Sequence, residues 1–319
     1  MNKKKFAIGI DFGGTNIRGG LVDNTGKIKN YIKISTGSQK NYQEIKNKII
    51  FILNKVISKN SSFKKNIAGV GIGFPGLIDV QRGIIIKSPN LPDLRNAPLA
   101  LDIAKKIELP VVVENDANTI AWGEYCCGKY KNPESMICIT IGTGIGGGII
   151  INNNIWRGFS NTAGEIGHMI IKENGIKCGC GSRGCLEQYA SASAMIRDAE
   201  KAIKRGVKTS LNLNKLTAFD IYKAAKKNDI LAKKIFLSSV HYLSLGIASL
   251  INSFNPEIIV IAGGVAKAGS FYISPLKKEV YMYAYTSLIN KTKIVKSTLG
   301  DCAGIIGSAF LILNADLNL

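Results

Sequence analysis

One local plan occurs twice in this 319-residue chain. Residues 6–28, FAIGIDFGGTNIRGGLVDNTGKI, predict an apolar strand, a glycine-rich turn and a second strand. Residues 136–155, MICITIGTGIGGGIIINNNI, repeat that order. Each copy is followed by mixed strand and helix patterns, so we expect two lobes that derive from one ancestral α/β unit. No low-complexity linker separates the copies, which predicts a short hinge.

The second turn contains GTGIGG, the glycine spacing of a dinucleotide-binding loop. That interpretation requires a helix after the turn, because the helix N-terminus holds the pyrophosphate. Here GIIINNNIW follows, which predicts a strand, so the dinucleotide interpretation fails. The sequence also has no G-x-x-x-x-G-K-[ST] loop, which excludes a Walker-type NTPase.

The two glycine turns can bind an anion without either motif. Backbone N–H groups approach a phosphate closely where no Cβ intervenes, and a neighbouring threonine adds a hydroxyl. Two such turns facing each other across a cleft could hold one triphosphate. Asp11 ends the first strand and could hold Mg²⁺ through water. The alternative is two tight hairpins with no ligand, and a third Gly-Gly pair at 263–264 favours the phosphate interpretation.

A cluster of thiols and one imidazole predicts a metal site. His168, Cys178, Cys180 and Cys185 form an H-x9-C-x-C-x4-C set. Four such ligands complete a tetrahedral Zn²⁺ site and leave no position for an activated water, so we expect a structural metal. A disulfide is the alternative, but it would leave one thiol and the histidine unexplained.

Two glutamates flank this zinc loop. Glu165 precedes His168 by three residues, and Glu187 follows Cys185 by two. Zinc uses one imidazole nitrogen and leaves the other N–H as an oriented donor. A rigid loop with two carboxylates and a fixed imidazole suits a polyhydroxylated ligand. The alternative is a pair of solvated surface carboxylates.

Composition limits the class of protein. The formal net charge is +20, but it comes from 35 lysines, scattered mostly in ones and twos, and only seven arginines. Nucleic-acid readers favour clustered arginine, so we expect no nucleic-acid partner. Seven cysteines and no export signal favour a reducing, cytoplasmic location. The apolar run 235–256 carries many Ser and Asn residues, which predicts a buried core helix and no membrane span.

Seven motifs then occur in a fixed order between about residue 6 and residue 310: DFGGTNIRGGLVD, GFPGLID, SPNLP, ENDAN, GTGIGGG, GEIGH and CGCGSRGCLE. In this set the chain resembles the ROK family of bacterial sugar kinases and related repressors. The cysteine segment is highly specific, whereas the glycine turns alone are a weak signal. SPNLP with ENDAN is most similar to the glucokinases of the family, many of which have an aromatic residue where this chain has DLRNAPL.

The resemblance implies an α/β, two-lobed, actin-like (ribonuclease H-like) ATPase fold, with duplicated mixed-sheet domains, a central cleft and a structural zinc loop. We expect residues 1–118 and 303–319 to form a small N-terminal lobe with the first phosphate turn and the catalytic Asp. Residues 119–302 would form a large C-terminal lobe with the second turn, the zinc loop and the adenosine-side glycines. The resemblance also implies a homodimer.

The activity implied is ATP-dependent phosphorylation of a hexose, glucose before N-acetylmannosamine, N-acetylglucosamine, mannose or fructose. ROK repressors carry a helix-turn-helix ahead of the first glycine turn. Only five residues precede Phe6 here, so we expect the enzyme. An actin-like ATPase or acyl-phosphate kinase is a third possibility, which the zinc loop and its glutamates disfavour.

Site residues follow from the resemblance by matching position. Asp116 of ENDAN would be the general base, and ATP, Mg²⁺ and structural Zn²⁺ the cofactors. The residues implied to bind the sugar are Gly76, Asn90, Asn115, Asp116, Glu165, His168 and Glu187. Those implied to bind Mg-ATP are Asp11, Gly13, Gly14, Thr15, Asn16, Arg18, Gly142, Thr143, Gly144, Gly146, Gly147, Gly263 and Gly264.

Overall fold

The computed structural model describes residues 6–37, 41–88, 91–130, 132–214 and 216–314. Its internal contacts divide the chain into two compact units. The first unit comprises Met1–Met136, Gly148–Gly164 and Thr298–Leu319, and the second comprises Ile137–Gly147 and Glu165–Ser297. This division differs from the expected boundaries at residues 118 and 303, because helix α3 (Asp116–Cys127) packs against α10 (Ala303–Leu313) inside the first unit.

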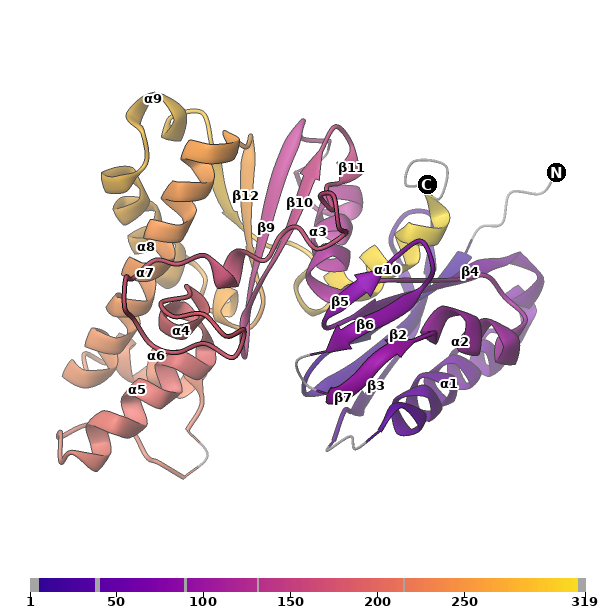
Figure 1. Cartoon of the computed structure of the whole chain (residues 1–319), viewed down its shortest axis with the longest axis horizontal. Helices are drawn as coiled ribbons and strands as arrows, with labels where there is room; N and C mark the ends of the chain where they lie inside the picture. Colours follow the sequence, from indigo (N-terminus) through magenta and orange to yellow (C-terminus); the bar gives the residue numbers. More distant parts are fainter. Residues whose placement is uncertain (1–5, 38–40, 89–90, 131, 215, 315–319) are drawn as a thin grey trace. The chain divides into compact units, whose positions relative to one another are not determined.

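The first unit is built on a mixed sheet with the strand order β3-β2-β1-β4-β8 (Figure 1). Strands β1, β2 and β3 pair antiparallel, whereas β4 pairs parallel with both β1 and β8. Strand β1 is buried along its whole length, as expected of a central strand that is covered on both faces. The strand bounds are β1 Phe6–Phe12, β2 Asn16–Asp23, β3 Ile28–Ser35, β4 Ile67–Phe74 and β8 Val111–Asn115.

Two helices and a small antiparallel sheet complete the core of the first unit. Helix α1 (Tyr42–Lys59) turns its aliphatic side chains toward β2 and β3, and α2 (Leu99–Ile107) packs against α1 and β8. The small sheet has the order β5-β6-β7. Its strands are β5 Leu77–Asp79, β6 Ile84–Ser88 and β7 Leu91–Ala97.

The second sheet has the order β11-β10-β9-β12-β13, which repeats the plan of the first. In each sheet three consecutive strands lie at one side, and two strands reached by longer connections follow. The duplicated mixed sheets predicted from the two glycine turns are therefore confirmed. The strand bounds are β9 Ser135–Ile141, β10 Ile145–Ile151, β11 Asn154–Ile155, β12 Ile258–Ala262 and β13 Lys293–Lys296.

The C-terminal helix α10 returns to the first unit and packs on β1, β4 and α3, as the sequence predicted (Figure 1). Its contact with the sheet is backbone to backbone. A Cβ on Gly71 of β4 would lie 1.7 Å from the carbonyl oxygen of Ser308, and one on Gly307 would lie 1.7 Å from that of Thr119. Glycine is required at both positions because any side chain would push the helix away.

Helices of the second unit pack around α7. Among the described residues, α7 is the one helix long and apolar enough to span a membrane, but 61% of its most apolar window is buried inside the protein. That burial identifies it as a core helix, as its Ser and Asn content predicted. The helix bounds are α4 Glu187–Ala190, α5 Ala192–Lys204, α6 Ala218–Lys226, α7 Ile230–Phe254, α8 Ser270–Tyr283 and α9 Thr286–Ile289.

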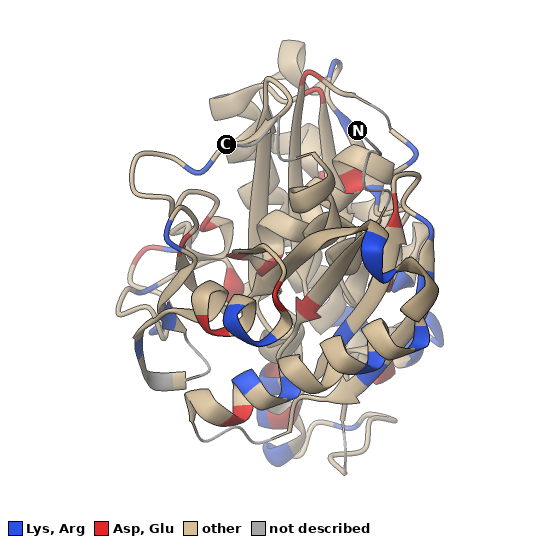
Figure 2. Ribbon diagram, turned by 90° about the vertical axis from the view of Figure 1, so that its right-hand side faces the viewer, with Lys and Arg blue, Asp and Glu red and all other residues tan. Residues whose placement is uncertain are grey.

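Charged residues are distributed over many elements. Figure 2 shows lysines and arginines on several helices and loops, interspersed with acidic residues. Several lysines lie over aromatic rings, such as Lys29 at 5.2 Å from the centre of Phe63 and Lys223 at 4.3 Å from that of Phe219. The lysine excess is thus spread along the chain in the structure, as it is in the sequence.

Candidate functional site

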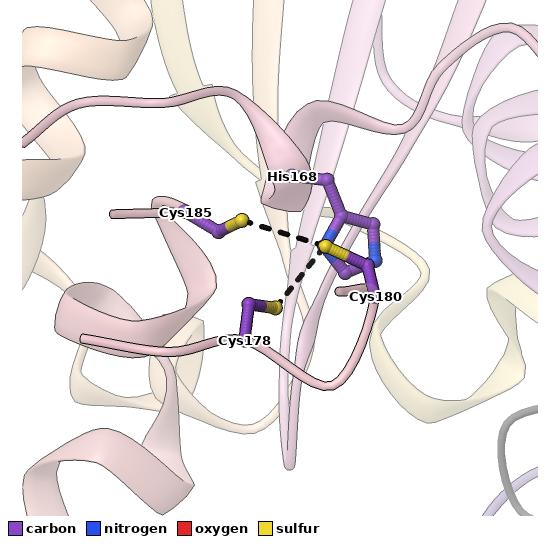
Figure 3. Close-up of side chains that lie close together, drawn as sticks. All are labelled: His168, Cys178, Cys180 and Cys185. Atoms are coloured by element: carbon purple, nitrogen blue, oxygen red, sulfur yellow. Dashed lines mark hydrogen bonds between the residues drawn. The ribbon is translucent and has the colours of Figure 1, made fainter. Parts of the chain in front are cut away.

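The four candidate metal ligands converge in the second unit (Figure 3). Their ligand atoms all lie within 4.8 Å of one another. The Sγ of Cys178 is 3.6 Å from Nδ1 of His168, and the Sγ atoms of Cys180 and Cys185 are 3.7 Å apart. The sequence spacing therefore brings one imidazole nitrogen and three thiols to one point.

Tight backbone contacts build this loop. The carbonyl of Cys178 accepts from the N–H of Gly181, which has φ 102°, a conformation that favours glycine. Cys185 forms an isolated antiparallel bridge with Ile170. That bridge returns the chain to the short turn that carries His168. A few glycines thus allow eight consecutive residues to supply three ligands.

The distances fit zinc. A tetrahedral Zn²⁺ with bonds of about 2.3 Å to sulfur and about 2.0 Å to nitrogen separates two sulfurs by about 3.8 Å, and sulfur from nitrogen by about 3.5 Å. The observed separations of 3.7 Å between the sulfurs and 3.6 Å between sulfur and nitrogen match these values. Burial, together with the neighbouring thiols of Cys178 and Cys180, raises the pKa of Cys185 to about 12. A cation that binds thiolates removes that penalty, so the donor set fits the metal.

Both candidate glutamates lie beside the zinc loop. The Nδ1 of His168 faces the thiols, while its Nε2 lies 3.8 Å from a carboxylate oxygen of Glu165. Partial burial raises the pKa of Glu165; His168 opposes this shift and the carboxylate of Glu187 adds to it. Glu165 and His168 are therefore in contact, and Glu187 is near enough for its charge to act on Glu165.

Glu187 also reaches the second glycine turn. Its Oε2 accepts a hydrogen bond of 2.9 Å from the backbone N–H of Ile145. A Cβ on Gly144 would lie only 2.1 Å from the same oxygen. Sequence reasoning missed Ile145, since nothing in an apolar β-branched residue marks its backbone N–H as part of a site.

The predicted nucleotide glycines of the second unit share one region. The turn is closed by a bond of 2.9 Å from the N–H of Gly142 to the carbonyl of Gly144, and Thr143 at its tip is exposed. Gly146 and Gly147 belong to β10. Gly263 has φ 87°, and a Cβ there would lie 2.4 Å from the carbonyl oxygen of Ile141, so the end of β12 abuts the end of β9. Gly264 is exposed.

The predicted general base begins helix α3 in the first unit. Asn115 is the N-cap, and its Oδ1 accepts from the N–H groups of Ala117 and Asn118 at 2.9 and 3.2 Å. Its Nδ2 donates to the carbonyl of Gly76 at 3.1 Å. Asp116 is therefore fixed on the first helical turn, where the helix dipole stabilises a negative charge. The predicted residues Gly76, Asn115 and Asp116 come together.

A buried ion pair, which the sequence did not reveal, supports this helix start. Glu114 has a side chain only 1% exposed, and its Oε2 accepts from Nε of Arg157 at 2.7 Å. Its Oε1 accepts from the N–H of Asn115 at 2.8 Å and from Nδ2 of Asn118 at 3.0 Å. The glutamate of ENDAN could have indicated a buried charge, but the sequence does not show its partner, which lies 43 residues away.

Asp11 lies beside the first glycine turn and is almost fully buried. Burial raises its pKa, although Arg18, whose Nη1 is 2.7 Å from Oδ2, acts in the opposite direction. A Cβ on Gly304, at the start of α10, would lie 3.0 Å from Oδ1, so that glycine lets the helix start approach the carboxylate closely. The turn is closed by a hydrogen bond from the N–H of Gly13 to the carbonyl of Asn16.

The predicted site residues thus fall into two groups. Gly14 and Thr15 are exposed at the tip of the first turn. That turn, Arg18, Gly76, Asn115 and Asp116 belong to the first unit, and the second turn, the zinc loop and its glutamates belong to the second. Asn90 lies outside the described residues.

A family model described as the ROK family matches residues 7–315. The chain belongs to the ROK family. A glucokinase of Halalkalibacterium halodurans is 37% identical over 314 residues, which cover 97% of this chain and 95% of that relative. A xylose repressor of Bacillus subtilis is 33% identical over 322 residues, which cover 100% of this chain and 80% of the repressor. The ROK family therefore contains both an enzyme and a regulator similar to this chain.

Among solved structures, a ROK family glucokinase from Streptomyces griseus, in complex with glucose and AMPPNP, is 33% identical. It superposes with a TM-score of 0.85, covering 97% of this chain and 99% of that one. The chain thus has the actin-like fold of ROK sugar kinases, as the sequence predicted.

Proposed function

We propose that this ROK protein is an ATP-dependent hexose kinase that converts glucose to glucose 6-phosphate. The observation that carries the proposal is Asp116, a carboxylate fixed on the first turn of α3 by the Asn115 cap and the buried Glu114 behind it. The similarity to the two glucokinases supports the same activity. N-acetylmannosamine, N-acetylglucosamine, mannose and fructose remain alternative substrates.

In this proposal Asp116 accepts the proton of the hexose hydroxyl as that oxygen attacks the γ-phosphorus of ATP. The new O–P bond forms while the bond between the γ-phosphorus and the bridging oxygen breaks, and ADP leaves. Phosphoryl transfer needs positioning and charge stabilisation more than covalent help, so one well-placed carboxylate is sufficient. Asn90, Asn115, Glu165, His168 and Glu187, with the backbone of Gly76, orient the sugar.

In this proposal the two glycine turns and the Gly263–Gly264 pair bind the nucleotide. Asp11 fits a role toward Mg²⁺, because its Oδ1 adjoins Gly304 while Arg18 holds Oδ2. When bound, Mg²⁺ neutralises charge on the phosphate oxygens. Zn²⁺ on the four ligands of Figure 3 would hold His168 and the loop before Glu187 in place. It would serve as a structural ion.

A sugar-responsive regulator is the second candidate, and the match to a xylose repressor, which covers all of this chain and 80% of the repressor, favours it. The two functions differ in what the protein does with DNA and ATP. We also propose a cytoplasmic location, because thiols that are to bind a metal must stay reduced. The resemblance implies a homodimer, and the scattered lysines argue against a nucleic-acid partner. A gel-shift assay at physiological salt that detects specific DNA binding would support the regulator.

A coupled assay with ATP and a panel of hexoses tests the proposal. We expect wild-type protein to release ADP fastest with glucose. Asp116→Asn should abolish turnover while glucose still binds by calorimetry, because the amide keeps the shape and cannot accept the proton. Asp198→Asn, at a carboxylate 44% exposed, is the matched control and should leave activity unchanged. Near-normal turnover by Asp116→Asn would refute the assigned base.

A further inference from the structure

We propose that Glu187 couples the hexose site to the phosphate-binding turn at residues 142–147, through the backbone N–H of Ile145. This inference rests on the proposed function, since it takes Glu187 as a hexose ligand. Its consequence is that hexose and nucleotide each strengthen the binding of the other.

The contact between the two sites is direct. Oε2 of Glu187 accepts from the N–H of Ile145 at 2.9 Å, and the two residues are 42 positions apart in sequence. Gly144 makes the approach possible, because a Cβ there would lie 2.1 Å from that oxygen. Its φ is not positive, so backbone conformation does not explain the glycine. The close approach of the Glu187 carboxylate explains it.

Two further contacts join the same segments. A Cβ on Gly167, next to His168, would lie 2.1 Å from the carbonyl oxygen of Ile145. The N–H of Ala192, at the start of α5, donates to the carbonyl of Gly142 at 2.9 Å. The turn is therefore held on its backbone from both sides of the zinc loop, and it cannot reorganise without moving residues next to the sugar ligands.

The coupling follows from the two oxygens of one carboxylate. Oε2 is engaged by the turn, whereas Oε1 has no hydrogen-bond partner among the described residues. A hexose hydroxyl that donates to Oε1 fixes the plane of the carboxylate and so retains the bond to Ile145. Binding of the hexose then already includes the loss of conformational entropy of that side chain and of the turn. The nucleotide binds a turn that is already ordered.

The expected coupling between hexose and nucleotide binding is modest, because one hydrogen bond transmits it. Allosteric coupling between two sites is typically about 5- to 150-fold in affinity, and a single contact places this case near tenfold. Linkage requires the same factor in both directions. Glucose should tighten Mg-AMPPNP binding roughly tenfold, and Mg-AMPPNP should tighten glucose binding equally.

The experiment is calorimetric titration of the full-length zinc-loaded protein with glucose and with Mg-AMPPNP, each alone and each at saturating amounts of the other. Gly144→Ala, whose methyl group displaces the Glu187 carboxylate, should reduce the coupling factor to about 1–2 while each ligand alone still binds. Asp198→Asn is the control, because this carboxylate is 44% exposed and belongs to neither binding site. It should retain the wild-type factor.

Glu187→Asp provides a second variant, since it keeps the carboxylate but shortens its reach to Ile145; it carries the test if Gly144→Ala does not fold. The inference is overturned if wild-type protein binds both ligands without coupling, or if both variants keep the wild-type factor. Wild-type protein that neither binds nor phosphorylates glucose would instead overturn the proposed function.

Discussion

Removing the guanidinium of Arg157 should strongly destabilise the first unit. Arg157→Ala leaves Glu114, 1% exposed, with two hydrogen-bond donors and no cation. Breaking a buried ion pair from one side costs about 3–5 kcal/mol, and the two remaining donors place this case near 3 kcal/mol. For a unit of this size that corresponds to a fall in Tm of about 6–12 °C.

Urea and thermal unfolding followed by circular dichroism measure the effect. The double variant Glu114→Gln with Arg157→Met removes both charges at similar volume and should recover all but about 1 kcal/mol of the loss. Arg82→Ala, which breaks a pair with Asp79 at an arginine 68% exposed, is the control and should cost less than about 1 kcal/mol. An Arg157→Ala protein as stable as the control would refute the reasoning.

Two further predictions concern packing and pH. Gly307→Ala should cost about 3 kcal/mol or more in urea unfolding, since its methyl group would lie 1.7 Å from the carbonyl of Thr119; equal stability would contradict the backbone contact. Burial opposes ionisation of Asp229, but hydrogen bonds from Ala232, Ser210 and Thr209 lower its pKa to about 2. This folded pKa is below the unfolded value of about 3.9, so the stabilisation is present above about pH 4 and disappears as the pH falls toward about 2. The unfolding free energy of wild type should therefore exceed that of Asp229→Asn near neutrality, and the difference should shrink progressively below about pH 4 until most of it is lost near pH 2. A constant difference across that range would contradict the assignment.

Features encoded by local spacing could be predicted from the sequence. The two glycine turns predicted the duplicated sheets, because a turn between two apolar runs is a local property of the sequence. The H-x9-C-x-C-x4-C set gave the convergence of His168 with three thiols, because a short glycine-rich loop has few ways to close. The Asn115 cap lies at the strand-to-helix junction where ENDAN predicted functional groups.

Contacts between distant segments could not be predicted. The bond from Ile145 to Glu187 and the pair of Arg157 with Glu114 each join residues more than 40 positions apart. The first contact uses the backbone N–H of Ile145, which no side chain marks in the sequence. The second uses Arg157, one of seven arginines, and no nearby carboxylate in the sequence indicates its partner. The placement of α3 with the first unit likewise depends on α10, which lies at the other end of the chain.

The central claim is that a bound metal ion holds the sugar-recognition loop, and the metal content of purified protein tests it most directly. Elemental analysis should find about one zinc per chain, four protein ligands being the full set for a structural site. Cys180→Ser should lose that zinc and bind glucose more weakly, although Cys180 is an exposed residue. Metal-free protein that phosphorylates hexoses at the normal rate would contradict the account.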